Sequence, residues 1–320
     1  MRARSLALIA SLLAAPFACH PEGSTPRAEP TRAASLELTR YEVRVDGHPI
    51  AVWGKRPQQL RGVIVLVHGR TWSARPDFDL QVVGASRSLM DALAARGYAS
   101  YAIDLRGYGE TPRDASGWLT PDRAAADLAG VLRWVGEREG AAPAVLGWSM
   151  GSIVSQLCAQ RNPTLLSALV LYGYPRDPDA VYEDPSDLPA LPEQKINTAE
   201  AAASDFRSPA VITPQVIDAF VAQALAADPV RVDWREAAQW NALDPGAVRV
   251  PTLILHGERD PYAPAEHQAR LYARLGHPTR GWIVIPGADH AAHLEDTMPW
   301  FVQAALGFLE RARDPAQRAR

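Results

Sequence analysis

Buried strands alternate with helical patterns along most of this sequence, and the alternation restricts the folds open to the chain. Residues 62–67, 98–104 and 168–172 are nearly continuous apolar runs, which indicate strands covered on both faces. Amphipathic helical patterns lie between them, one of them beginning at Thr120-Pro121 with a capping threonine and a proline at the first helical position. The alternation predicts right-handed βαβ units and a doubly wound, mostly parallel sheet.

The flanks of this region also carry secondary-structure signals. Alternating apolar residues over 36–53, interrupted by Asp46-Gly47, indicate a β-hairpin. A helix is expected over 86–96, where Gly97 closes the pattern. After position 250 a strand, a helix over 264–275, a strand over 281–285 and a final helix from about 298 to 311 follow one another.

The alternation breaks in the second half of the chain. Residues 175–190 are rich in proline and aspartate, and 198–241 show a helical pattern without strands. This stretch is too long for a plain connection. It predicts a helical cap at 176–246, inserted between the two parts of an α/β core at 36–175 and 247–320.

The N-terminus has the pattern of a targeting segment. Two arginines precede an apolar run at 6–17 that is too short to span a bilayer as a mature helix. Residues 1–18 are therefore predicted to be a signal peptide, and 19–35 a flexible spacer rich in proline, serine and threonine. Cleavage before Cys19 resembles that of a bacterial lipoprotein, with Cys19 lipidated and the protein tethered to a membrane. Plain secretion remains an alternative, and either route makes this an exported protein.

Composition excludes several classes of function. The chain of 320 residues is 47% hydrophobic and 22% charged, as soluble globular proteins are. Its formal charge of −3, with acidic and basic residues intermixed, argues against a nucleic-acid partner. The sequence has no His-Glu-x-x-His, Cys-x-x-Cys, Gly-x-x-x-x-Gly-Lys or Gly-x-Gly-x-x-Gly motif, so we expect no metal and no cofactor.

One short segment carries the clearest chemical signal. Gly147-Trp148-Ser149-Met150-Gly151 follows an apolar run and passes into a helical pattern, which is the signature of a nucleophile elbow. A sharp strand-to-helix turn lifts the serine hydroxyl towards a base and towards backbone N–H donors. The alternative is an ordinary turn in which the serine caps the helix.

Polar residues follow the other predicted strands at the edge where ligands collect in parallel sheets. An acid, Asp260, and a histidine, His290, each come after a strand and follow Ser149 in chain order. Serine, acid and histidine in this order are one known arrangement of a catalytic triad.

Taken together, these motifs resemble the α/β-hydrolase family over nearly everything after the spacer. The matching segments are His68-Gly69, Asp104-Leu-Arg-Gly-Tyr-Gly109, Gly147-Trp-Ser-Met-Gly151, Gly257-Glu-Arg-Asp260 and Gly287-Ala-Asp-His290. The resemblance implies an α/β-hydrolase fold: a doubly wound, mostly parallel eight-stranded sheet with an inserted helical cap.

The resemblance also implies roles for individual residues. Ser149 would be the nucleophile, His290 the general base and Asp260 the residue that orients the imidazole. The backbone N–H groups of Met150 and Arg70 would form the oxyanion hole, with Thr71 in place of Arg70 as the alternative.

Several assignments have competitors in the sequence. Glu258, Asp177 and Asp179 compete with Asp260, and His293 competes with His290, although His293 more readily fits a packing or capping role. Trp72 and Trp148 are candidates for lining the pocket or for filling the core. His68, Asp104 and Arg106 fit a structural role in the loops, and the Arg70 side chain fits either a surface position or contact with an anionic substrate.

The functional prediction is an exported serine hydrolase that cleaves a small-molecule carboxylic ester, or a related acyl bond, through an acyl-enzyme. An acyltransferase or thioesterase on the same fold is the main alternative. A non-catalytic binding protein of this fold is the other, although such proteins usually lack part of the triad. The sequence indicates neither the substrate nor the oligomeric state.

Overall fold

The central sheet of the protein contains eight strands in the order β1-β2-β6-β3-β8-β9-β11-β12. The computed structural model describes residues 36–313, which belong to one unit, Ser35–Arg320. Strands β1 and β2 form the antiparallel hairpin predicted around Asp46-Gly47, β2 runs antiparallel to β6, and the remaining neighbours are parallel. The predicted fold class is therefore confirmed. The strands are β1 (Thr39–Val45), β2 (His48–Lys55), β3 (Gly62–Val67), β6 (Tyr98–Ile103), β8 (Ala144–Trp148), β9 (Ala168–Tyr172), β11 (Thr252–Gly257) and β12 (Arg280–Ile285).

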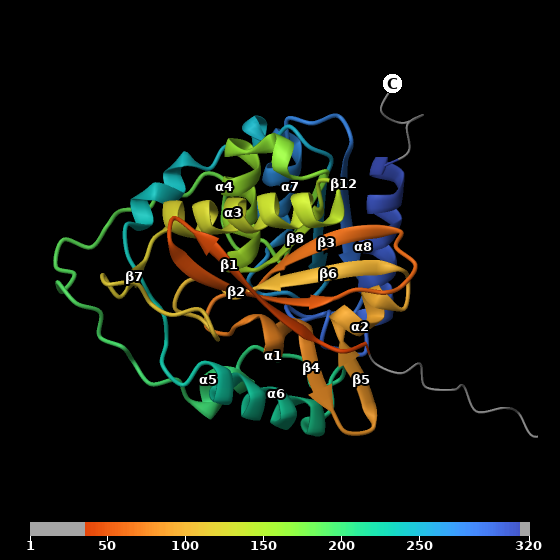
Figure 1. The fold of residues 1–320 in the computed structure, drawn as a ribbon, viewed down its shortest axis with the longest axis horizontal. Helices are drawn as coiled ribbons and strands as arrows, with labels where there is room; N and C mark the ends of the chain where they lie inside the picture. The colour runs from red at the N-terminus through yellow and green to blue at the C-terminus, as the bar shows by residue number, and fades with distance from the viewer. Residues whose placement is uncertain (1–35, 314–320) are drawn as a thin grey trace, which may run out of the picture. The chain divides into compact units, whose positions relative to one another are not determined.

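Helices cover both faces of this sheet (Figure 1). The alternation of side chains along β3 shows why: Ile64 and Leu66 face one hydrophobic core, whereas Val63, Val65 and Val67 face the other. One face is covered by α1 (Ala74–Phe78), α2 (Leu89–Ala94) and α8 (Met298–Arg313), and the other by α3 (Pro121–Glu139), α4 (Met150–Arg161) and α7 (Ala265–Arg274).

Two local predictions are wrong. The segment predicted as a helix over 86–96 begins as a strand: β5 (Ala85–Ser88) pairs with β4 (Asp79–Val82), and α2 starts only at Leu89. Ser88 determines this boundary because its hydroxyl accepts from Asp91 N and donates to Asp79.

The stretch predicted as helical without strands contains a short strand as well. Within 198–241, α5 (Ala199–Ala203) and α6 (Pro214–Ala227) are helical, but β10 (Asp233–Trp234) pairs in parallel with β7 (Trp118–Leu119). The 3₁₀ turns η2 (Ala237–Ala242) and η3 (Pro245–Ala247) complete the segment, and η1 (Pro163–Leu165) lies before β9.

The segment between β9 and β11 contributes no strand to the central sheet. Helix α6 packs on α1 and β4 on the face that carries α2, as Figure 1 shows in teal. Helix α6 is therefore next to α1, which belongs to the segment after β3, and α5 packs against α6. Among residues 36–313, no helix is long and apolar enough to cross a membrane. The predicted signal peptide (1–18), Cys19 and the whole of the predicted spacer (19–35) lie outside the described residues.

Candidate active site

Ser149 lies at a sharp turn between β8 and α4, at the carboxyl edge of the sheet. Its φ of 52° and ψ of −120° are unusual for a residue with a side chain. The turn is tight because a Cβ on Gly151 would collide with the carbonyl of Val67, and one on Gly147 with the carbonyl of Gly151. The Ser149 side chain makes no capping hydrogen bond to α4, which removes the alternative of a capping serine.

A second pair of residues meets at the same edge. His290 Nδ1 lies 2.9 Å from Asp260 Oδ2, and both side chains are buried. Asp260 follows β11, and His290 follows β12. Because a carboxylate only accepts hydrogen bonds, the contact places the imidazole proton on Nδ1 and leaves Nε2 as the free basic nitrogen.

Trp148 and Tyr172 connect the Ser149 turn to His290. The indole N–H of Trp148 donates to the His290 carbonyl at 2.9 Å, and the Tyr172 hydroxyl donates to the same oxygen at 2.7 Å. The Tyr172 carbonyl in turn accepts from Ser149 N at 2.8 Å. Within residues 36–313 no hydrogen bond joins the Ser149 hydroxyl to His290. Such contacts are often long without substrate and tighten when it binds.

The competing acids are engaged elsewhere. Glu258 accepts from Gly287 N at 2.7 Å, Asp177 is paired with Arg270 at 2.8 Å, and Asp179 is paired with Arg274 at 2.6 Å. Asp260 is therefore the acid that the structure joins to His290.

His293 and His68 are buried structural histidines. The ring of His293 packs 4.6 Å from Trp148 and 5.4 Å from Tyr172, and burial lowers its pKa to about 3. His68 Nε2 accepts from Leu105 N at 3.0 Å, and Nδ1 donates to its neighbour's carbonyl, that of Gly69, at 2.8 Å. Burial lowers the pKa of His68 to about 4, so both rings are neutral at pH 7.

The loop after β3 lies against Ser149. A Cβ on Gly69 would be 3.4 Å from Ser149 Cβ, and Gly69 N donates to the buried Asp77 at 3.3 Å. Arg70 is exposed, and Thr71 has a φ of 94°. No hydrogen bond within residues 36–313 uses Arg70 N, and Met150 N, in the first turn of α4, has no intrahelical acceptor. Both N–H groups are free to bind a ligand oxygen.

The motif after β6 supports this loop. Asp104 accepts from Ala74 N and Trp53 Nε1, both at 2.9 Å, and burial raises its pKa to about 6. Arg106 makes a two-pronged contact with Asp127 at 2.9 and 2.7 Å. These residues hold turns in place, as expected from the sequence.

Trp72 and Trp148, the two pocket candidates, are buried in the core. Trp72 donates to Asp205 Oδ2 at 2.9 Å and packs at 6.3 Å from the ring of Phe220. Both contacts reach residues between β9 and β11. The two tryptophans are therefore core residues: Trp72 bonds to Asp205, and Trp148 bonds to the His290 carbonyl.

Sequence reasoning missed three residues from the segment between β9 and β11. Asp228 accepts from Ser73 N and Gly109 N, both at 2.8 Å, and thereby ties the end of α6 to two core loops. Asp205 and Arg231 reach Trp72 and Thr71. No motif marks these residues, and their partners lie more than 100 positions away.

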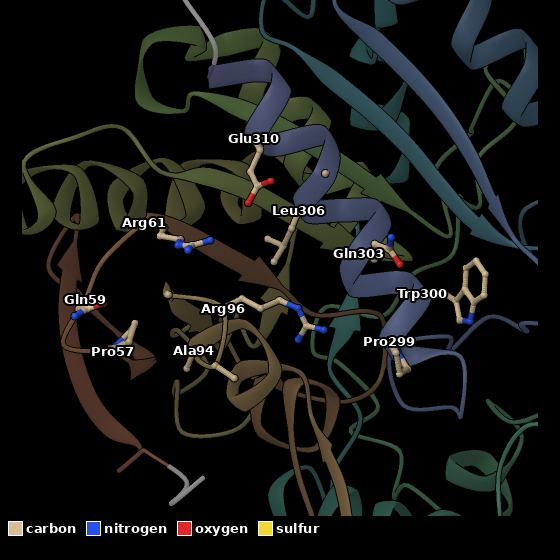
Figure 2. A pocket seen from close by; sticks show the side chains of 13 residues that line it. Pro57, Gln59, Arg61, Ala94, Arg96, Pro299, Trp300, Gln303, Leu306 and Glu310 are labelled. Carbon is tan, nitrogen blue, oxygen red and sulfur yellow. The ribbon is translucent and has the colours of Figure 1, made fainter. Parts of the chain in front are cut away.

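A cavity lies at the opposite edge of the sheet. It has a volume of about 920 Å³ and is bordered by the residues before β3 and β6, by the end of α2 and by α8. Figure 2 shows Arg61, Arg96, Trp300 and Glu310 around it. None of the predicted site residues lines this cavity. In the described part of the chain, no cluster of three or more His, Cys, Asp or Glu side chains is arranged to hold a metal ion.

Comparison with known proteins identifies the family of the chain. Residues 58–297 match the model of a protein family described as serine aminopeptidase, S33. The chain belongs to this family. It is a serine hydrolase with the α/β-hydrolase fold.

Relatives of this serine hydrolase share its length. It is 25% identical to the mouse serine hydrolase BPHL over 290 residues, which are 84% of this chain and 86% of that protein. It is 26% identical to the 2-hydroxy-6-oxo-6-(2'-aminophenyl)hexa-2,4-dienoic acid hydrolase of Metapseudomonas resinovorans, over 80% of this chain and 87% of that protein. A malate-bound esterase from Thermogutta terrifontis has the same fold, with a TM-score of 0.62 at 21% identity; the match covers 86% of this chain and all (100%) of that one.

Proposed function

We propose that this serine hydrolase cleaves a carboxylic ester, or a related acyl bond, with Ser149, His290 and Asp260 as a catalytic triad. The hydrogen bond of 2.9 Å between Asp260 and His290, at the edge where Ser149 occupies its strained turn, is the observation that carries the proposal. This pair is buried, so the imidazole is held in one orientation and one tautomer.

The reaction begins when His290 Nε2 takes the proton of the Ser149 hydroxyl and Ser149 Oγ attacks the substrate carbonyl. The oxyanion that forms accepts from the N–H groups of Met150 and Arg70, which have no other acceptor within residues 36–313. His290 then returns the proton to the leaving alkoxide, and an acyl-enzyme on Ser149 remains. Water, deprotonated by His290, hydrolyses this ester and releases the acid and the free serine.

Asp260 acts by stabilising the imidazolium that forms in both halves of the cycle. The Trp148 and Tyr172 hydrogen bonds to the His290 carbonyl fix the backbone that carries the ring. These contacts support the proposal because they connect β8 and β9, which flank the Ser149 turn, to the backbone of His290.

A fluorophosphonate probe tests the nucleophile. Wild-type protein should be labelled once per chain, and Ser149→Ala should remain unlabelled. Ser116→Ala, at an exposed turn, is the matched control and should label normally. Failure of the wild type to label would overturn the proposed mechanism, and labelling of Ser149→Ala would show that another residue is the nucleophile.

An acyl-chain series of chromogenic esters, compared with thioesters, lactones and aminoacyl anilides, tests the bond. The anilides are included because the family description names an aminopeptidase. We expect the highest kcat/KM on an ester. Preference for a thioester, or transfer of the acyl group to an added alcohol or thiol in place of water, would instead identify a thioesterase or an acyltransferase.

We also propose that residues 1–18 direct export and that Cys19 is lipidated, a proposal that rests on the sequence alone. Cys19→Ser should move the protein from the membrane fraction to the soluble fraction and abolish incorporation of labelled palmitate. An unchanged distribution would favour plain secretion.

A further inference from the structure

Arg231 lies between α6 and β10 and has unused hydrogen-bonding capacity. Its Nη2 donates to Thr71 Oγ1 at 3.2 Å, while its Nε is buried and has no acceptor within residues 36–313. None of the ion pairs of these residues includes Arg231. A guanidinium removed from water normally has its donors satisfied, most often by a carboxylate.

Other arginines with a buried, unpartnered Nε are compensated in ways that Arg231 is not. Arg87 is paired with Asp296, and Arg235 lies 3.6 Å from Glu236. Arg176 donates to the Ala180 carbonyl at 2.6 Å and lies over the ring of Tyr182. The Arg231 guanidinium has only the neutral hydroxyl of Thr71 as a partner within residues 36–313, so it makes no charge-assisted hydrogen bond there.

The position of Arg231 links this capacity to the active site. Thr71 belongs to the loop whose Gly69 lies against Ser149, and the next residue, Trp72, donates to Asp205 at 2.9 Å. Two acids of the same segment face this loop: Asp205 accepts from Trp72, and Asp228 accepts from Ser73 N. Burial raises the pKa of Asp205 to about 6, against the opposing influence of His290, of the Trp72 hydrogen bond and of Arg231. Through its contact with Thr71, Arg231 therefore touches the loop that lies beside Ser149.

Arg70 supplies a second positive charge at the same loop. Its side chain is exposed, and none of the ion pairs formed within the described residues includes it. Asp205 offsets one of the two charges when it is ionised, but it is not within ion-pair distance of either arginine and already accepts from Trp72. Neither Arg70 nor Arg231 is therefore within ion-pair distance of a carboxylate in the described part of the chain.

We infer that Arg231, assisted by Arg70, binds a carboxylate on the substrate, so that the preferred substrates are esters whose acyl part ends in a free carboxylate. The fork of a guanidinium matches a carboxylate with two parallel hydrogen bonds, which a neutral ester cannot supply. This inference rests on the proposed ester cleavage at Ser149 and adds the class of substrate to it.

Kinetics on paired substrates provide the first test. The 4-nitrophenyl monoesters of succinic, glutaric and adipic acid are each compared with the neutral ester of equal chain length, after subtraction of spontaneous hydrolysis. Wild-type kcat/KM should be at least about tenfold higher for one of the monoesters than for its neutral counterpart, as expected for a charge-assisted contact. Arg231→Gln should lower this ratio by about tenfold, Arg231→Lys by less, and Arg70→Gln by less than Arg231→Gln.

A charge-matched control and a binding measurement complete the design. Arg133→Gln removes one exposed positive charge from α3 and should leave the ratio at its wild-type value. Calorimetric titration with glutarate, which needs no turnover, should show binding to the wild type and at least about tenfold weaker binding to Arg231→Gln. Labelling by the neutral fluorophosphonate checks that each variant retains a folded, reactive site.

The outcomes separate the two claims. If no ester is cleaved but glutarate binds through Arg231, ester cleavage is wrong and carboxylate recognition stands. If esters are cleaved with equal ratios in wild type and Arg231→Gln, and glutarate binds both equally or neither, the inference about Arg231 is overturned while ester cleavage stands.

Discussion

The two edges of the central sheet differ: one carries a large cavity, and the other carries the candidate catalytic residues. The amino edge carries the cavity of about 920 Å³ between the start of β3, α2 and α8, lined by exposed arginines and by Trp300. The carboxyl edge carries the strained Ser149 and the buried pair of Asp260 and His290. No histidine lines the cavity at the amino edge, whereas the carboxyl edge holds an acid, a base and a hydroxyl.

The difference follows from the parallel strands. Every loop that leaves a parallel strand at its carboxyl end meets its neighbours at one edge, so residues from distant parts of the chain converge there. At the other edge the chain arrives from the helices that cover the sheet. The strained backbone of Ser149 and the paired side chains of Asp260 and His290 thus mark the carboxyl edge as the candidate site.

The largest expected effect is on the acid of the carboxyl edge. Asp260→Asn should lower kcat by about 10⁴-fold, because the amide favours the wrong imidazole tautomer and no longer stabilises the imidazolium. Ester hydrolysis under saturating substrate measures it. Glu258→Gln is the matched control, since the Glu258 carboxylate accepts from Gly287 N, and it should change kcat by less than about threefold. The reverse ranking would assign the acid to Glu258.

The next effect concerns the tie between α6 and the core loops. Asp228→Asn loses an anionic acceptor for Ser73 N and Gly109 N, so the free energy of unfolding should fall by about 2 kcal/mol and kcat by about tenfold. Urea unfolding and ester kinetics measure the two quantities. Asp218→Asn, exposed on the same helix, should leave both unchanged. An unchanged kcat in Asp228→Asn would show that the loops hold their shape without this contact.

Part of the loss of folding stability at acid pH should come from His293, at the carboxyl edge. The folded-state pKa of His293 lies at about 3, below its ordinary value of 6.5, because burial disfavours the charged ring. Its contribution to stability is therefore complete above pH 6.5 and is lost as the pH falls towards 3, by about 1.4 kcal/mol per pH unit within this window. His293→Phe should remove that slope from urea-unfolding data between pH 4 and 6.5. The half-buried His277, mutated to Asn, should retain it, and an unchanged slope in His293→Phe would contradict the assignment.

The smallest effect is expected at the amino edge. Trp300 is 64% exposed beside the large cavity, and Trp300→Ala should change kcat/KM for esters by less than about twofold. A tenfold loss of kcat/KM in this variant would mean that the cavity takes part in turnover, and the functional difference between the two edges would not hold.

Much of the core and the proposed triad positions could be predicted from the sequence because their signals are local. The elbow around Ser149, the buried strands and the order of Asp260 and His290 are visible as short motifs after apolar runs. The competing acids could be separated only by the structure, which engages Glu258 with Gly287.

Long-range contacts could not be predicted. Asp228 and Arg231 act on loops more than 100 positions away, and no periodicity or motif marks such a partner. The β4–β5 hairpin was missed for a different reason: the helical spacing of Leu89 and Leu93 extends only into α2, and the preceding strand is defined by its pairing with Asp79–Val82.

The carboxylate at the end of α6 also bears on modular engineering. Because Asp228 bonds to backbone N–H groups of both the loop after β3 and the loop after β6, residues 176–246 are not a detachable lid. A chimaera that grafts this segment onto another hydrolase scaffold would keep its geometry only if both recipient loops offered donors at matching positions. We therefore expect that substrate range can be transferred only by moving residues 176–246 together with the loops after β3 and β6.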